Sequence, residues 1–213
     1  MPEIAIKICG ISTSEALAAV IAARADFVGF NFHPASPRYI EPSAAQLLAR
    51  QAEGRVQRVG LFVDASDVSI SDAVGVGLLD ALQLHGGESP ARAAELRTRF
   101  GLPVWKVISV ASLADLERAS AYAGAADFLL LDAKTPAGSL PGGMGLKFDW
   151  ALLGRWKAPL PWGLAGGLTP DNVRDAISQT GAPLVDTASG VESTPGVKDP
   201  ALIAAFCQAV RSA

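Results

Sequence analysis

The segment IAIKICG (residues 4–10) decides the fold, because it is the first of eight short apolar runs that share one pattern. Each run is a few residues long and rich in Ile, Val, Leu or Phe, which is typical of a β-strand. Stretches rich in Ala and Leu, with the composition of helices, lie between the runs. The further runs are residues 26–32, 57–63, 81–86, 103–110, 127–133, 161–166 and 183–189.

The alternation of strands and helices predicts the fold class, because such units form a parallel sheet. Eight units in 213 residues predict an α/β fold, a single-domain (βα)8 TIM barrel over residues 1–213. An open doubly wound sheet is the alternative, but no GxGxxG motif follows the first strand. The long Gly- and Pro-rich segment at residues 134–147 is expected to be a lid or a disordered loop.

Several expected helices begin with a residue that caps a helix N-terminus, in places next to a proline. The helix near residues 66–76 should be the weakest, because the sequence VGVG breaks it. The expected cap positions are residues 12–14, Ser43 behind Pro42, Ser89 before Pro90, and Thr169 before Pro170.

The composition indicates a folded protein with no bulk attraction for polyanions. Half of the residues are apolar, 18% are charged, and the net charge is -3. With only Cys9 and Cys207, we expect a reduced, cytoplasmic protein. No signal-peptide pattern is present, and Glu15, Arg24 and Asp26 interrupt the most apolar early segment. The expected partner is a small molecule, not nucleic acid or a membrane, and the chain is expected to be a monomer or a homodimer.

Cys9 and Asp132 are the candidate reactive groups, because active sites of such barrels lie at the C-terminal ends of the strands. Cys9 ends the first strand, where it is either a small buried hydrophobe or a reactive thiol. Lys7 points to the same side of that strand, and a nearby cation favours a thiolate. Asp132 follows the apolar run FLLL of the sixth strand, where it either caps a loop or acts as an acid or base.

Further polar residues are expected at the same end of the barrel. Gln83 and His85 end the fourth strand, and His85 either serves the site or bonds a loop. Arg38 follows the second strand and carries a planar cation suited to a carboxylate, although it could be solvated instead. His33 has no evident partner, and Asp64 ends the third strand. No HxH, HExxH or CxxC pattern occurs, so we expect no metal site.

Glycine-containing turns after the last two strands predict a phosphate site. Gly166 and Gly167 follow the seventh strand, and Ser189 and Gly190 follow Asp186 of the eighth. Phosphate sites in these barrels are commonly built there, since glycine lets backbone amides approach the oxygens. One such turn alone could be ordinary, but the two together predict a phosphorylated substrate. No Walker or Rossmann glycine pattern indicates a nucleotide cofactor.

Seven sequence blocks, in order over residues 7–199, resemble the signature of the phosphoribosylanthranilate isomerase family. The resemblance implies a (βα)8 barrel without metal or cofactor. It implies conversion of N-(5-phospho-β-D-ribosyl)anthranilate to 1-(2-carboxyphenylamino)-1-deoxyribulose 5-phosphate, the Amadori step of tryptophan synthesis. The blocks are KICGIS, SPRYI, LQLHG, LLLDAKTP, GGMGLKFDW, GLAGGLTPDNV and SGVESTPGVKD.

The same resemblance implies roles for individual residues. Cys9 would be the general base, Asp132 the general acid, and Arg38 the ligand of the anthranilate carboxylate. This chemistry requires a raised pKa for Asp132 and, for Cys9, a pKa near or below neutrality, with Lys7 as the group that lowers it. The residues expected to bind substrate are Lys7, Arg38, Gln83, His85, Gly166, Gly167, Asp186, Ser189 and Gly190.

Three places depart from the family pattern, and three different functions stay open. Ala165 replaces a serine before the glycine pair, and Met144 replaces a small hydroxyl residue in the expected lid. The block after the eighth strand reads DTASG where the family often has Asp-Val-Ser-Ser-Gly, but Ser189 is kept. The first of these functions is that of the histidine-pathway aminoaldose isomerase, which is similar in fold and reaction but has a carboxylate at the position of Cys9. The second is a non-catalytic phosphate-binding barrel, and the third is a Schiff-base aldolase that uses Lys106 or Lys134.

Overall fold

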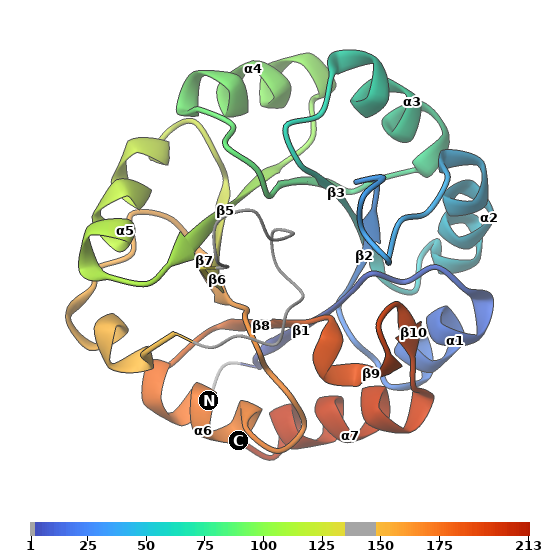
Figure 1. The fold of residues 1–213 in the computed structure, drawn as a ribbon. Helices are drawn as coiled ribbons and strands as arrows, with labels where there is room; N and C mark the ends of the chain where they lie inside the picture. The colour runs from blue at the N-terminus through green and yellow to red at the C-terminus, as the bar shows by residue number, and fades with distance from the viewer. Residues whose placement is uncertain (1–2, 135–147) are drawn as a thin grey trace.

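Eight parallel strands form a closed barrel in the order of the sequence, and helices surround it in the computed structural model (Figure 1). The structure describes residues 3–134 and 148–213. The expected (βα)8 barrel is therefore confirmed. Its strands are β1 (Ala5–Cys9), β2 (Phe27–Asn31), β3 (Gln57–Phe62), β4 (Ala81–Leu84), β5 (Val104–Val110), β6 (Phe128–Ala133), β7 (Trp162–Leu164) and β8 (Leu184–Thr187).

The outer layer consists of α-helices and short 3-10 helices that pack their apolar faces on the strands. In β8 and β1 the chain closes on itself, with Lys7 in register with Asp186. The elements of the outer layer are α1 (Ser14–Ala22), α2 (Pro42–Ala52), α3 (Asp67–Gly77), α4 (Pro90–Phe100), α5 (Leu113–Glu117), η1 (Arg118–Tyr122), η2 (Trp150–Arg155), α6 (Val173–Thr180) and α7 (Pro200–Arg211). The short 3-10 helix η3 (Ser189–Val191) lies instead in the connection between β8 and α7.

Aromatic side chains fill the N-terminal end of the barrel interior. The Trp105 ring lies 5.0 Å from the Phe27 ring and 4.5 Å from the Phe128 ring, measured between centroids. Phe27 and Phe128 are the first residues of their strands. This end is therefore closed by apolar rings. A site is expected at the opposite end, where the C-terminal ends of the strands carry polar side chains.

The helix starts agree with the sequence in some places and differ in others. Ser89 caps α4 as expected, because its hydroxyl accepts a hydrogen bond from the Arg92 amide. The expected start of α2 at Ser43 is wrong, since the helix begins at Pro42 and Glu41 is its N-cap. The expected start at Thr169 is also wrong: a turn fills the gap before α6, and Asn172 accepts the Thr169 amide proton.

The glycine-containing sequence VGVG does not break the third helix, contrary to expectation. α3 continues through Gly75 to Gly77 and has Ser66 as its N-cap. Ile70 and Ala73 of this helix are buried against the barrel. Burial of this apolar face outweighs the unfavourable helix propensity of glycine, which is about 1 kcal/mol per residue.

A short hairpin extends the connection between β8 and α7. Its strands are β9 (Glu192–Thr194) and β10 (Val197–Lys198), joined antiparallel, and Figure 1 shows them inside the ring of helices near α1 and α7. The hairpin touches the loop after β2, since a Cβ at Gly196 would lie 2.5 Å from the Pro37 carbonyl oxygen. Across the described ranges, no helix combines the length and apolarity required to cross a membrane.

Candidate active site

One pocket gathers most of the predicted site residues at the C-terminal ends of the barrel strands. It also includes Asn31, Ser36 and Thr187, which no sequence pattern singled out, and His33, for which the sequence indicates no partner. Lys7 and Gly190 are not in its wall. The predicted residues that line the pocket are Cys9, Arg38, Gln83, His85, Asp132, Gly166, Gly167, Asp186 and Ser189.

Lys7 lies beneath the pocket, beside the thiol of Cys9. Its side chain is fully buried, and its Nζ donates a hydrogen bond to Asp186 Oδ1 at 3.0 Å. Gly29 of the neighbouring strand makes room for both groups, because a Cβ there would lie 2.7 Å from Cys9 Sγ and 3.2 Å from Lys7 Nζ. The partner that offsets the cost of this buried ammonium is therefore Asp186.

Burial raises the pKa of the Cys9 thiol above its ordinary value. Lys7 and Lys198 act in the opposite direction, and Asp186 adds to the increase. The pKa of Cys9 is therefore raised, contrary to the expectation that Lys7 holds it near or below neutrality. Lys7 does favour the thiolate, but the loss of hydration on burial has the larger effect.

Asp132 is held at the end of β6 by its own loop and by His85. Its Oδ1 accepts a hydrogen bond from the Ala133 amide at 2.8 Å, and its Oδ2 lies 3.2 Å from His85 Nε2. Gln83 Nε2 lies 3.5 Å from His85 Nδ1. The buried Gln83 Oε1 has no hydrogen-bond partner among the described residues, so this acceptor in the pocket wall is available to a ligand donor.

The two loops expected to bind phosphate contact each other at the pocket wall. Gly166 and Gly167 have φ angles of 86° and 62°, which glycine adopts without strain. Thr187 Oγ1 donates a hydrogen bond of 2.7 Å to the Leu168 carbonyl. A Cβ at Gly190 would lie 1.9 Å from the same oxygen. Gly190 therefore permits the contact between the loops and does not itself line the pocket.

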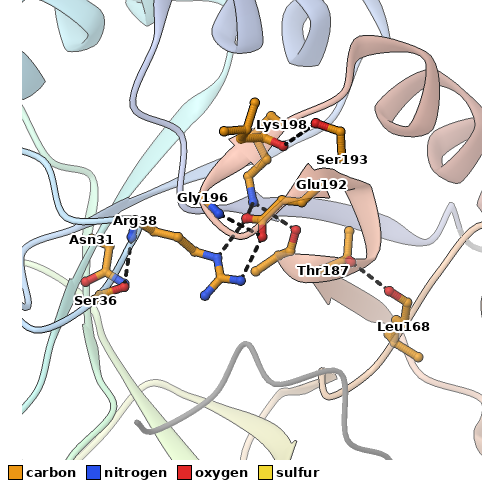
Figure 2. Close-up of polar contacts among 11 residues, drawn as sticks. Asn31, Ser36, Arg38, Leu168, Thr187, Glu192, Ser193, Gly196 and Lys198 are labelled. Atoms are coloured by element: carbon orange, nitrogen blue, oxygen red, sulfur yellow. Dashed lines mark hydrogen bonds and ion pairs between the residues drawn. The ribbon is translucent and has the colours of Figure 1, made fainter.

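Arg38 reaches the pocket wall from the loop after β2, where a carboxylate holds it. Its Nε and Nη2 donate to the two oxygens of Glu192 at 2.7 and 2.8 Å (Figure 2). Lys198 Nζ lies 2.6 Å from the same carboxylate. The sequence does not single out Glu192 and Lys198 as site residues. Both belong to the block SGVESTPGVKD, and its resemblance to the family signature is the feature that could have indicated them.

The remaining lysine candidates lie away from the pocket wall. Lys106 Nζ is buried and bonds the Leu84 and Gly86 carbonyls and Glu88 Oε2, so this geometry disfavours it as a Schiff-base nucleophile. Lys134 Nζ is half exposed and lies 3.7 Å from Asp115. The rest of the expected lid, residues 135–147 with Met144, lies outside the described residues.

A metal would need several ligands close together. In the ranges that the structure describes, no group of three or more His, Cys, Asp or Glu side chains is arranged to hold one. Asp64, two residues after β3, accepts the Gly87 amide proton at 2.8 Å, and its own amide donates to Glu88. Asp64 therefore organises the loop after β4.

The closed parallel barrel, with a polar pocket at the C-terminal ends of its strands, places the protein among the (βα)8-barrel enzymes. Residues 6–209 match the family model described as N-(5'phosphoribosyl)anthranilate (PRA) isomerase. The chain belongs to this isomerase family, which confirms the resemblance noted in the sequence.

Known relatives are similar to this protein in sequence and structure over nearly the full chain. An N-(5'-phosphoribosyl)anthranilate isomerase of Rhodospirillum rubrum is 51% identical, with 99% of each chain covered. The crystal structure of phosphoribosyl anthranilate isomerase from Thermotoga maritima is 36% identical, with a TM-score of 0.89 over 99% of this chain and all of that one. A further structure of such an enzyme, 34% identical with a TM-score of 0.86 over 99% of this chain and all of that one, contains reduced 1-(o-carboxyphenylamino)-1-deoxyribulose 5-phosphate.

Proposed function

We propose that the protein converts N-(5-phospho-β-D-ribosyl)anthranilate to 1-(2-carboxyphenylamino)-1-deoxyribulose 5-phosphate, the third step of tryptophan synthesis from chorismate. The observation that carries the proposal is the meeting of Cys9 and Asp132 in one pocket with the turns at residues 166–167 and 188–189. Residues 1–213 would act as one catalytic domain. The steps are proton transfers between side chains and substrate, so the proposed reaction needs no cofactor.

Asp132 is the proposed general acid. The closed aminoaldose opens to a Schiff base when the C1–O bond breaks, and the ring oxygen must receive a proton in that step. Asp132 Oδ2 is available for this role because Oδ1 accepts the Ala133 amide proton and fixes the carboxyl group. His85, with Nε2 at 3.2 Å, orients the same oxygen.

Cys9 is the proposed general base, which removes the proton from C2 to give an enolamine that relaxes to the ketone. Only the thiolate can accept this proton. Lys7 and Lys198 favour the thiolate electrostatically, whereas burial opposes it. Cys9 and Asp132 lie on β1 and β6, with two strands between them through β8 and β7, so they can act from different sides of the sugar.

Substrate binding would use the two ends of the pocket. Backbone amides near Gly167 and Ser189 would bind the phosphate, since glycine allows close approach of the backbone. The Arg38 guanidinium would bind the anthranilate carboxylate through charge-assisted hydrogen bonds. The relative with bound reduced product analogue supports this assignment, because that ligand carries both a carboxylate and a phosphate.

A fluorescence assay tests the proposal, since anthranilate emission is lost as the substrate is consumed. We expect wild-type protein to turn over the substrate, and Cys9→Ser and Asp132→Asn each to lose about 10²–10⁴-fold in kcat. Asp132→Asn should still bind the reduced product analogue within about tenfold, because the amide keeps the shape of the carboxyl group.

Two matched variants control for damage to the fold. Cys207→Ala removes the other buried thiol, which lies on α7 away from the pocket. Asp26→Asn alters a carboxylate at the opposite end of the barrel, where it accepts the Ile6 amide proton. Both should keep wild-type kcat. Full activity of Cys9→Ser or Asp132→Asn would contradict the proposed mechanism.

A further inference from the structure

Three charged side chains form a buried chain of contacts beside the pocket. Glu192 binds Arg38 through both carboxylate oxygens, and Lys198 Nζ donates to Glu192 Oε1 at 2.6 Å (Figure 2). The side chains of Glu192 and Lys198 are only 3% and 2% exposed. We call Arg38, Glu192 and Lys198 the charged triad.

The charged triad connects the two proposed binding ends of the pocket. Lys198 Nζ also donates a hydrogen bond of 2.8 Å to the Ala188 carbonyl. Ala188 lies in the pocket wall next to Ser189, in the loop proposed to bind phosphate. An unbroken series of polar contacts therefore runs from the Arg38 guanidinium to the backbone of that loop.

Arg38 is also confined from its other sides. A Cβ at Gly10 would lie 2.6 Å from Arg38 Cδ, so the arginine packs closely on the chain after β1. The Gly196 amide donates to Glu192 Oε2 at 3.2 Å, which ties the hairpin to the triad. Ser36 Oγ accepts the Arg38 amide proton at 3.1 Å. The position of the guanidinium is thus fixed by neighbours on several elements.

Overall stability does not explain the triad well. Burying charged groups is unfavourable, and apolar residues of similar size often stabilise a fold as well or better. Neither Glu192 nor Lys198 lines the pocket, so neither would touch the substrate. Their contacts, however, lead to the two groups whose spacing a substrate with anions at both ends must match.

We propose that Glu192 and Lys198 are positioning residues that fix Arg38 relative to the phosphate-binding loop, so that the pocket selects ligands by the separation of their carboxylate and phosphate. This inference rests on the proposed function. Glu192 sets the direction of the guanidinium, and Lys198 sets its distance from the loop through the Ala188 carbonyl. A ligand with only one of the two anions gains nothing from this alignment.

Binding measurements with three probes test the inference without turnover. The probes are the reduced product analogue, the same compound without its carboxylate, and inorganic phosphate, titrated by calorimetry. In Glu192→Gln we expect the Kd of the full analogue to rise about 10-fold or more, the size of a lost charge-assisted hydrogen bond. The Kd values of the analogue without carboxylate and of phosphate should change less than about twofold.

Lys198→Met gives a second, independent result. It removes the contact to the loop as well as that to Glu192, so we expect weaker binding of both the full analogue and inorganic phosphate. Glu192→Asp should restore part of the affinity of Glu192→Gln for the full analogue, because it keeps the charge. Glu95→Gln is the matched control, since Glu95 pairs with Arg92 on α4 outside the pocket wall and its loss should leave all three Kd values unchanged.

Two outcomes overturn the inference, and a different one overturns the proposed function. If Glu192→Gln weakens all three probes equally, or none of them, the triad supports the fold and does not position Arg38. If Lys198→Met binds phosphate as the wild type does, Lys198 does not position the loop through the Ala188 carbonyl. If the wild-type protein binds neither analogue, the proposed function itself fails.

Discussion

Gly190 is the position where a single methyl group should separate the two loops proposed to bind phosphate. A Cβ at this residue would lie 1.9 Å from the Leu168 carbonyl oxygen and 2.8 Å from Thr187 Oγ1. An ordinary contact begins near 3.4 Å, so in Gly190→Ala one loop must move by about 1.5 Å. Leu168 directly follows Gly167 in the pocket wall, and this displacement therefore reaches the proposed phosphate site.

The expected size of the effect follows from this displacement. A misplacement of about 1 Å in a catalytic site can reduce the rate about 10²-fold. We therefore expect kcat/KM of Gly190→Ala to fall about 10²-fold and the inhibition constant of inorganic phosphate to rise at least about 10-fold. Forcing the methyl group into a packed contact should also lower the free energy of unfolding by about 1–3 kcal/mol.

Steady-state fluorescence kinetics with phosphate as competitor measure the first two effects, and urea unfolding measures the third. Gly75→Ala on α3 is the control, because a Cβ there meets no atom within 4 Å. In a helix this substitution should raise stability by about 0.5–1 kcal/mol and leave inhibition unchanged. If Gly190→Ala were inhibited by phosphate as the wild type is, the phosphate site would have to lie elsewhere.

Two further predictions concern buried ionisable groups. Because burial raises the pKa of Cys9, kcat/KM should keep rising with pH through neutrality, and Lys7→Met should move this rise to still higher pH. A pH–rate plateau that begins below pH 7 would contradict the proposed role of Cys9 as the general base. Lys106→Met leaves the Glu88 carboxylate buried without its ion pair, so it should cost about 3–5 kcal/mol in urea unfolding, and the added change Glu88→Gln should recover part of this loss.

The barrel was predictable because each strand is a short apolar run, and pattern alone locates such runs to within a few residues. The helix starts were less predictable, because neighbouring residues that favour capping, a first helical position or a helix break occur close together. Pro42 takes the first helical position and displaces Ser43 as the cap. In α3, packing of Ile70 on the barrel outweighs the glycine signal.

Within the site, the sequence places residues at strand ends but does not show how deeply they are buried or which side chains they contact. Cys9 and Lys7 could be set on one face of β1 from the period of a strand. The pKa of Cys9 depends on how deeply the closed barrel buries it, which no local pattern contains. The partner of Arg38 is Glu192, 154 positions away, so only the folded chain shows that the two form an ion pair.

The ion pair between Lys7 and Asp186 joins the first barrel strand to the last, across 179 positions of the chain. At ribosomal rates of about 5–20 residues per second, Asp186 is synthesised roughly 9–36 s after Lys7. Until then β1 carries an ammonium that it cannot bury. A nascent chain that stops before β8 therefore cannot close the barrel around Lys7, and the pocket end of the barrel is completed only after β8 has been translated.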